Sequence, residues 1–292
     1  MTDFVFRQYT QSELDRQYDQ SVWAAKSRQT VIQRYRELSE MARARLGPPL
    51  EFAYGETDAE LIDVYRTGQD AAPIHIYIHG GAWRSLDKRD SAFAAELFVS
   101  AGVHFIAVNF ALLPKVELRT MVHQVRNSIA WAYRNAHLFG GDRERIFLSG
   151  HSSGAHLAAC AAVTRWEQSF GLPGNILKGT LCCSGAYDLE PVRLSARNRY
   201  MHLDETAVHD LSPNRHLKHL GCPISFAVGE LESDEFRRQS AKIATSAGVE
   251  LALGSGLDHF QISETLGQPS GLLATIAIAQ MSSLNRSSSV HP

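Results

Sequence analysis

The pentapeptide Gly150–Gly154, with the sequence Gly-His-Ser-Ser-Gly, constrains the fold of this chain more than any other segment. The apolar run Ile146–Ser149 precedes it and predicts a buried strand, and the helix-like stretch Ala155–Cys160 follows it. Two glycines between a strand and a helix predict a reversal so sharp that larger side chains there would collide with neighbouring backbone. Ser152 at the apex is then expected to be strained, with its hydroxyl in open space.

Strand-like and helix-like segments alternate along most of the chain, which demands a mostly parallel sheet covered by helices on both faces. We therefore expect an α/β fold that begins with an antiparallel pair of strands. The expected strands are Leu50–Tyr54, Leu61–Tyr65, Ile74–Ile78, Val103–Phe110, Ile146–Ser149, Gly179–Ser184, Pro223–Val228 and Val249–Leu253. The expected helices of this region are Asp87–Ser100, Val116–His137, Glu235–Ala247 and Ile262–Met281.

The chain divides into three segments of different character. Residues 1–47 are polar, carry a candidate cap at Ser12–Asp15, and place apolar residues at helical spacing up to Leu46, so we expect a helical segment that packs on the core or the site mouth. Residues 48–284 form the α/β domain, in which the basic, irregular stretch 190–219 predicts a cap-like insertion near the site mouth. The serine-rich residues 285–292 predict a flexible tail.

The composition excludes several classes of protein. The 292 residues are 44% hydrophobic with a formal net charge of −2 and no basic run, so we expect neither nucleic acid nor a membrane as partner. No apolar run approaches the length of a membrane span, and the N-terminus lacks the pattern of a secretion signal. A cytoplasmic location is the expectation, because Cys160, Cys182, Cys183 and Cys222 have neither disulfide-like nor metal-ligand spacing.

Ser152 is the candidate nucleophile of an acyl-transfer reaction. Such chemistry needs a nucleophile, a base that takes its proton, an acid that orients the base, and hydrogen-bond donors for the oxyanion. The helix after Ser152 would point its N-terminal amides at the developing negative charge. The alternative reading, an ordinary serine that caps a helix, does not require the flanking glycines and the preceding apolar strand.

The oxyanion donors are expected in the loop His79–Trp83, which follows a predicted strand. Glycine lets backbone amides approach a substrate oxygen without obstruction, so we assign the amides of Gly80 and Gly81, together with the amide of Ser153. A plain Gly-Gly turn is the alternative. We expect His79 to be a hydrogen-bonded scaffold residue, and Trp83 either to line a pocket or to fill the core.

His259 is the candidate base among 13 histidines, because it alone lies in a glycine-rich loop between the last strand and the final helix. His151 and His156 flank Ser152 too closely in sequence to reach back over it, so packing or a supporting hydrogen bond is their alternative role. His216 and His219 have the spacing of a metal pair but no third ligand nearby, which favours a solvated face.

The acid should follow the penultimate strand, which ends at Gly229. Counting three residues onward gives Glu232, with Asp234 as the rival. Either carboxylate could instead face solvent or cap the following helix. A glutamate suffices for the task, since it needs only to accept from the second ring nitrogen of the histidine and to stay ionised. The order serine, acid, histidine along the chain is that of the α/β-hydrolases.

These motifs resemble those of an α/β-hydrolase of the kynurenine formamidase (arylformamidase) type, within the hormone-sensitive-lipase-like esterases. The resemblance covers most of the chain and rests on the sequences at 79–83, 150–159, 184–191, 229–240 and 258–260. It implies Ser152 as nucleophile, Glu232 as acid, His259 as base, and an oxyanion hole at Gly80–Gly81. The family usually has aspartate at the position of Glu232, which keeps Asp234 as an alternative acid.

The resemblance also implies a substrate class, N-formyl aromatic amines, with side activity on small aryl esters. Ala82 stands where the formamidases often have a larger aromatic residue, so a roomier pocket is expected. The sequence contains no phosphate loop, dinucleotide fingerprint or convincing metal-ligand cluster, so no cofactor and no metal are predicted. The residues predicted to line the substrate pocket are Ala82, Trp83, His151, Tyr187 and Phe260.

The function predicted from the sequence is that of a serine hydrolase which cleaves a small amide or ester through an acyl-enzyme, most simply an arylformamidase-like amidase. The substrate is expected to be a small molecule. A general carboxylesterase, or a hydrolase of carbamates and amides of foreign compounds, would use the same residues and is the main alternative. A hydrolase-fold protein that only binds a ligand is a further alternative. A homodimer is the commonest arrangement if the protein is oligomeric.

Overall fold

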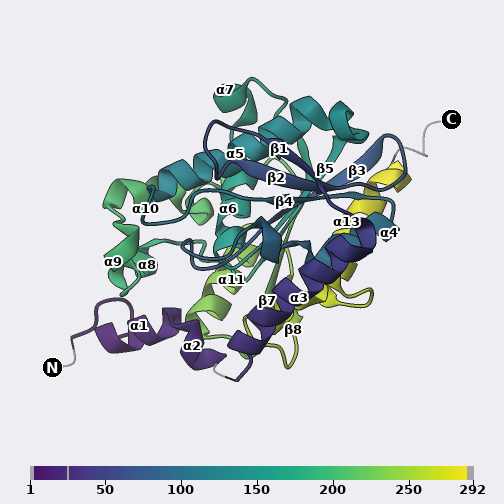
Figure 1. The fold of residues 1–292 in the computed structure, drawn as a ribbon. Helices are drawn as coiled ribbons and strands as arrows, with labels where there is room; N and C mark the ends of the chain where they lie inside the picture. The colour runs from purple at the N-terminus through teal and green to yellow at the C-terminus, as the bar shows by residue number, and fades with distance from the viewer. Residues whose placement is uncertain (1–2, 25, 288–292) are drawn as a thin grey trace.

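The computed structural model describes residues 3–24 and 26–287, without the side chains of residues 283–287. Its centre is an eight-stranded sheet in the order β1-β2-β4-β3-β5-β6-β7-β8 (Figure 1). β1 pairs antiparallel with β2 and β2 with β4, and every later pairing is parallel, which confirms the expected α/β fold. The strands are β1 (Leu50–Ala53), β2 (Leu61–Tyr65), β3 (Ala72–Ile78), β4 (His104–Val108), β5 (Gly141–His151), β6 (Leu177–Cys183), β7 (Ile224–Gly229) and β8 (Leu251–Gly254).

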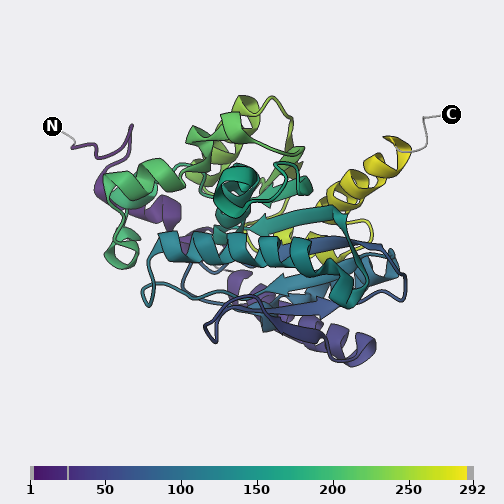
Figure 2. The same cartoon turned by 90° about the horizontal axis from the view of Figure 1, so that it is seen from above.

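Helices cover both faces of the sheet (Figures 1 and 2). Side chains alternate between faces along each strand, so Ile76 and Leu148 join one buried apolar cluster while Tyr77 and Phe147 join the other. The first cluster includes residues of α5 (Leu118–Asn135), α6 (Ser153–Ala162) and α11 (Asp234–Ser246). The second includes residues of α3 (Arg28–Leu46), α4 (Ala95–Ser100) and α13 (Leu272–Ser287).

Two predicted helices are interrupted in the structure. Residues 87–100 form two 3-10 turns, Lys88–Asp90 and Ala92–Ala94, before α4 begins. The buried ammonium of Lys88 is held by Asp63 and Glu51, which fixes this stretch against the sheet rather than in a regular helix.

The second interruption divides residues 261–287 into α12 (Gln261–Glu264), a 3-10 turn at Thr265–Gly267, and α13. A side chain at Gly271 would lie 2.0 Å from the carbonyl oxygen of Thr265, so the chain passes too close to itself for a continuous helix. Pro269 also disfavours the helical conformation of the residue before it.

The N-terminal segment consists of α1 (Gln11–Tyr18), α2 (Gln20–Trp23) and α3. The cap of α1 is Thr10 rather than the predicted Ser12, because Thr10 and Glu13 bond reciprocally to each other's backbone amides. Tyr18 donates to Glu235, and Arg34 forms an ion pair of 2.6 Å with Glu264. These bonds hold α1 and α3 against the C-terminal part of the chain.

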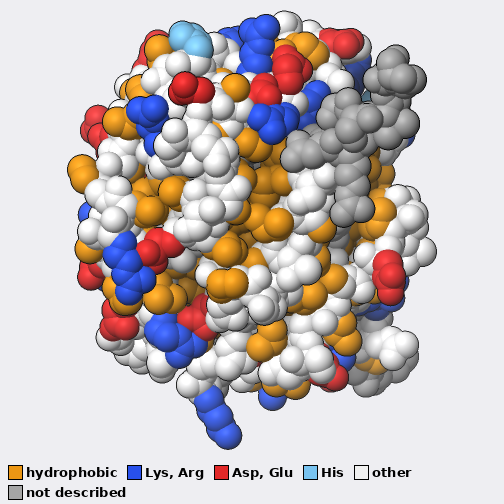
Figure 3. All heavy atoms as spheres, turned by 90° about the vertical axis from the view of Figure 1, so that its right-hand side faces the viewer, with side chains coloured by type: hydrophobic (Ala, Val, Ile, Leu, Met, Phe, Trp, Pro, Cys, Tyr) orange, Lys and Arg blue, Asp and Glu red, His pale blue; other side chains and the backbone are white. Residues whose placement is uncertain are grey.

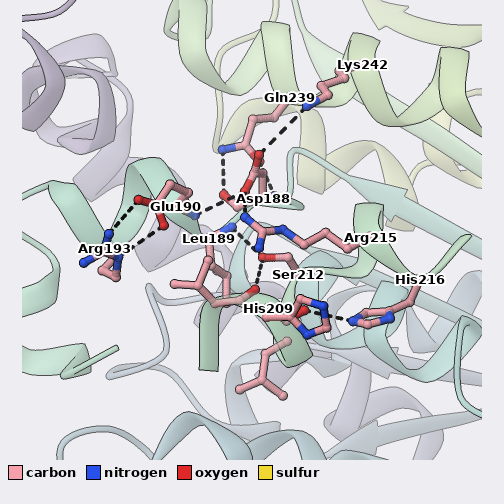
Figure 4. A network of polar contacts seen from close by, with 12 residues as sticks. Asp188, Leu189, Glu190, Arg193, His209, Ser212, Arg215, His216, Gln239 and Lys242 are labelled. Atoms are coloured by element: carbon pink, nitrogen blue, oxygen red, sulfur yellow. Dashed lines mark hydrogen bonds and ion pairs between the residues drawn. The ribbon is translucent and has the colours of Figure 1, made fainter. Parts of the chain in front are cut away.

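Between β6 and β7 lie α8 (Glu190–Leu194), α9 (Asn198–Met201) and α10 (Glu205–Leu211). Asp188 anchors this stretch: its N–H donates to Gln239 of α11 at 2.7 Å, and its carboxylate contacts Arg215 and Lys242 (Figure 4). The division into domain, insertion and tail stays a prediction. Residues 288–292 of the predicted tail lie outside the described residues, and residues 285–287 belong to α13.

In the part of the chain that the structure describes, no helix is long and apolar enough to cross a bilayer. All four cysteines are buried and unpaired, and burial raises the pKa of Cys160 to about 12.

On the side of the molecule where the C-terminus lies, hydrophobic side chains gather toward the middle of the face and charged ones toward its edges (Figure 3). The homodimer stays a prediction.

Candidate active site

The turn at Gly150–Gly154 has the predicted geometry. Ser152 lies between β5 and α6 with φ 57° and ψ −122°, a left-handed conformation that is strained for a residue with a side chain. A Cβ atom at Gly150 would lie 2.3 Å from the carbonyl oxygen of Gly154, and one at Gly154 would lie 2.1 Å from the carbonyl oxygen of Ile78. Glycine is therefore required at both positions if the serine is to stand at this apex.

Ser152, His259 and Glu232 form a continuous chain of hydrogen bonds. The Oγ atom of Ser152 lies 2.9 Å from Nε2 of His259, and Nδ1 of His259 lies 2.7 Å from Oε2 of Glu232. The three side chains follow β5, β8 and β7 and meet at the carboxyl ends of these strands, where open α/β sheets bind ligands. All three are buried. This geometry lets the imidazole take the proton of the hydroxyl while the carboxylate holds the ring.

The structure places Glu232, not Asp234, against His259. The second carboxylate oxygen of Glu232 accepts from the backbone N–H of Gly229 at 2.7 Å and from the hydroxyl of Ser184 at 2.5 Å. Asp234 lies in the first turn of α11, faces solvent and pairs with Arg237. Sequence reasoning gave Ser184 no role, although it directly follows β6 at the same edge of the sheet and has a positive φ of 57°.

The loop after β3 packs directly against Ser152. A Cβ atom at Gly80 would lie 2.9 Å from the carbonyl oxygen of His151 and 3.2 Å from Cβ of Ser152, so only glycine allows this approach. Gly81 has a φ of +105°, which also favours glycine. Within the described chain, the backbone N–H groups of Gly80, Gly81 and Ser153 donate no hydrogen bond. These three donors are available to a ligand beside the serine.

The other histidines near Ser152 are scaffold groups. His151 donates from Nε2 to the backbone oxygen of His259 at 2.7 Å, and burial holds its pKa well below the usual range. His79 donates from Nδ1 to the backbone oxygen of Gly80, and its ring stacks on Phe110 at 4.3 Å. Each therefore fixes the backbone beside the serine. Of the described residues, no three His, Cys, Asp or Glu lie close enough together to hold a metal ion. His219, one of the two histidines with the spacing of a metal pair, is partly exposed.

His156 makes the stability of the protein depend on pH. Its Nε2 donates to the backbone oxygen of Leu211 at 2.7 Å, Trp83 donates to its Nδ1, and burial lowers its pKa to about 4. An unfolded histidine has a pKa near 6.5, so below that pH the unfolded state binds the additional proton. The stability due to neutral His156 is therefore present above about pH 6.5 and is lost as the pH falls toward about 4.

The variant His156→Gln, whose amide can keep both hydrogen bonds, tests this dependence. Between pH 7 and pH 4.5 we expect wild type to lose about 2–3 kcal/mol more free energy of unfolding than the variant. Urea unfolding at both pH values measures the difference. Equal losses in the two proteins would mean that the pKa of His156 is the same in the folded and unfolded states.

A cleft of about 960 Å³ opens onto Ser152 and His259. Of the predicted pocket residues, Ala82, His151 and Phe260 line it, and Gly81 lies beside them. Two predictions are wrong. Trp83 is buried behind the loop with its indole N–H on His156, and Tyr187 is buried against Phe226 with its hydroxyl accepting from the N–H of Gly185. Neither side chain lines the cleft.

Two segments distant in sequence complete the walls of the cleft. The N-terminal segment contributes residues between Asp15 and Tyr35, and the region of α9 contributes Ser195 to Arg197, Arg199 and Tyr200. The hydroxyl of Tyr200 donates to the backbone oxygen of Ala82 at 3.2 Å, which ties α9 to the loop after β3. The sequence indicated that both segments lie near the site mouth but not which of their side chains face it.

Comparison with known proteins places the chain in a family. It is 33% identical to a kynurenine formamidase of Danio rerio over 94% of this chain and 97% of the relative. The chain belongs to the kynurenine formamidase family. A kynurenine formamidase of Salmo salar is 34% identical over 89% of this chain and 93% of the relative, and the BD-FAE family model matches residues 62–180.

The fold of this family member is that of the α/β-hydrolases. A crystal structure from Silicibacter sp. tm1040, provisionally described as a thioesterase, superposes with a TM-score of 0.83 and 22% identity, over 91% of this chain and 99% of that one. The resemblance to the kynurenine formamidases that the sequence motifs predicted is thus confirmed, and the protein is a serine hydrolase.

Proposed function

We propose that this protein hydrolyses N-formylated aromatic amines, with N-formylkynurenine or a close relative as substrate. The observation that carries the proposal is the hydrogen-bonded chain Ser152–His259–Glu232 at the base of a cleft, in a chain that matches kynurenine formamidases over nearly its whole length. A small-molecule substrate suits a cleft of about 960 Å³.

In the proposed mechanism, Nε2 of His259 takes the proton of Ser152 as the serine oxygen attacks the formyl carbon. The N–H groups of Gly80, Gly81 and Ser153 stabilise the oxyanion, and Glu232 stabilises the imidazolium that forms. The imidazolium then protonates the leaving arylamine as the C–N bond breaks. Water, deprotonated by His259, attacks the formyl-enzyme, and formate leaves as Ser152 regains its proton.

A general carboxylesterase is the second candidate, favoured by the small side chain of Ala82 in the cleft wall and by the size of the cleft, which exceeds what a formyl group fills. Both candidates use the same residues, so only substrate preference separates them.

The ratio of kcat/KM for N-formylkynurenine to that for p-nitrophenyl acetate tests the proposal. We expect the formamide to be preferred by at least about tenfold, which corresponds to about 1.4 kcal/mol of additional transition-state stabilisation. Negligible cleavage of the formamide beside rapid cleavage of the ester would assign the protein to the carboxylesterases instead.

We also propose a cytoplasmic location. Its support is the four cysteines, which are all unpaired. Disulfides form mainly in the oxidising environment of secreted proteins, so unpaired cysteines favour a reducing compartment.

A further inference from the structure

A second cavity, of about 590 Å³, shares no lining residue with the catalytic cleft. It lies where α5 and α10 meet, and its walls come from the first half of α5, the end of α10 and the chain just after α10 (Figure 1). Two arginines and two histidines line it, against a single acid among the described residues. This composition distinguishes the cavity from an ordinary surface depression.

The basic side chains approach the cavity from two walls. Arg119, His123 and Arg126 are four and three residues apart in α5, the spacing that brings side chains to one side of an α-helix. His216 lies on the opposite wall, where its Nε2 atom donates to the backbone oxygen of His209 at 2.9 Å (Figure 4). That bond fixes the imidazole ring, so the positive groups are arranged around the cavity rather than scattered over the surface.

Arg126 is partly buried and has no carboxylate beside it. Its Nη2 atom donates to the backbone oxygen of Cys160 at 3.3 Å, which is the one hydrogen bond of this guanidinium within the described chain. Its Nε atom is buried and unpaired, whereas its Nη1 atom, which also has no partner there, is accessible. Burial lowers the pKa of Arg126, and the positive charge of Arg119 lowers it further. An anion in the cavity would stabilise this guanidinium.

Asp210, the acid of the cavity, is already engaged. Its Oδ2 atom accepts from Nη1 of Arg119 at 3.1 Å, and its Oδ1 atom lies 3.1 Å from Nδ1 of His209. Among the described residues it forms no ion pair with Arg126. Two guanidinium groups against one carboxylate leave the cavity positive even with both of its histidines neutral. Positive charge in a concave site concentrates anions there.

We propose that the cavity between α5 and α10 binds a phosphate group, either as the free ion or as part of a small molecule. Its donors are the guanidinium groups of Arg119 and Arg126 and the hydroxyl of Thr120, which also lines the cavity. Phosphate oxygens accept several charge-assisted hydrogen bonds at once, and the planar fork of arginine matches their geometry. The site is separate from the catalytic cleft, so the inference holds whichever substrate the protein cleaves.

Calorimetry with phenyl phosphate and with inorganic phosphate, at constant ionic strength, measures the binding. We expect one site with a Kd of about 1 mM or tighter for at least one of the two probes. Tighter binding of the ester would identify a phosphorylated small molecule as the ligand, and equal binding would identify the free ion. Acetate, with one charge, should bind at least about tenfold more weakly. Acetate binding as tight as that of phosphate, or no binding of either phosphate probe, would overturn the proposal.

The variant Arg126→Gln tests the partly buried guanidinium. We expect the Kd for phosphate to rise at least about tenfold, because a hydrogen bond between two charged groups is lost. Arg134→Gln is the matched control: Arg134 also belongs to α5 and donates to a backbone oxygen, that of Phe170 at 2.6 Å, but it lies outside the cavity. We expect its Kd to stay within about twofold of wild type. Equal weakening in both variants would overturn the proposal.

Two further variants keep the test decisive if Arg126→Gln fails to fold. The side chain of Arg119 is 52% exposed, so Arg119→Gln should fold, and we expect it to raise the Kd for phosphate about three- to tenfold. Arg197→Gln removes an arginine that lines the catalytic cleft instead, and we expect it to leave the Kd unchanged. Weaker binding in Arg197→Gln with none lost in Arg119→Gln would place the anion in the cleft and overturn the proposal.

Discussion

Replacing Ser152 with alanine is expected to lower kcat by about 10⁴- to 10⁶-fold while the fold is retained. The serine supplies the oxygen that forms the acyl-enzyme, and among the residues that the structure describes no other hydroxyl is bonded to His259. The activity that remains would come from the oxyanion donors and from binding alone. Steady-state kinetics on N-formylkynurenine measures the loss, and circular dichroism checks the fold.

A fluorophosphonate probe supplies an independent readout, because it labels an activated serine without requiring the natural substrate. We expect it to label wild type and not Ser152→Ala. Equal labelling of the two proteins, or no labelling of wild type, would favour a hydrolase-fold protein that binds a ligand without turning it over.

Replacing Glu232 with glutamine is expected to lower kcat by about 10³- to 10⁴-fold through the tautomer of His259. The N–H of Gly229, which bonds one oxygen of Glu232, can only donate, so the glutamine must keep its oxygen there. Its NH₂ group then points at Nδ1 of His259 and donates to it. The ring must carry its proton on Nε2, the atom that has to accept the proton of Ser152.

Asp234→Asn is the matched control for this prediction, since it removes a carboxylate two residues away that faces solvent. We expect its kcat to stay within about twofold of wild type, as for a change at an exposed ion pair. A larger loss in Asp234→Asn than in Glu232→Gln would contradict the role proposed for Glu232. The measurement is the kcat of both variants on N-formylkynurenine.

The strand-turn-helix at Ser152 could be predicted because its steric demands are local. The glycines that make it possible and the serine at its apex lie within five consecutive residues, so the pattern itself carries the geometry. The sequence left Glu232 and Asp234 as two candidates for the acid, because counting from the end of a strand tolerates an error of a residue or two. A local signal was present: Ser233 caps α11, which places Asp234 in the first helical turn and Glu232 before it.

The walls of the cleft could not be predicted from local pattern. Arg197 reaches the cleft because it bonds to the backbone of Tyr18, 179 residues earlier, and such a pairing leaves no periodic trace in the sequence. The prediction that Trp83 and Tyr187 line the cleft is wrong for a related reason. An aromatic side chain next to a functional loop fills the core or faces the ligand according to its side-chain torsion angles, which depend on the packing around it. Here both side chains point into the core.

The bonds between the N-terminal helices and the rest of the protein have a consequence for biosynthesis. Tyr18, Ser27 and Arg34 find their partners 217, 231 and 230 residues later, in Glu235, Asp258 and Glu264. Isolated short helices are marginally stable in water, so we expect α1 and α2 to remain undocked in a nascent chain until Glu235 and the residues after it have been translated. These helices are therefore made well before their partners and dock late, and translation products that end before Glu235 lack a finished binding cleft.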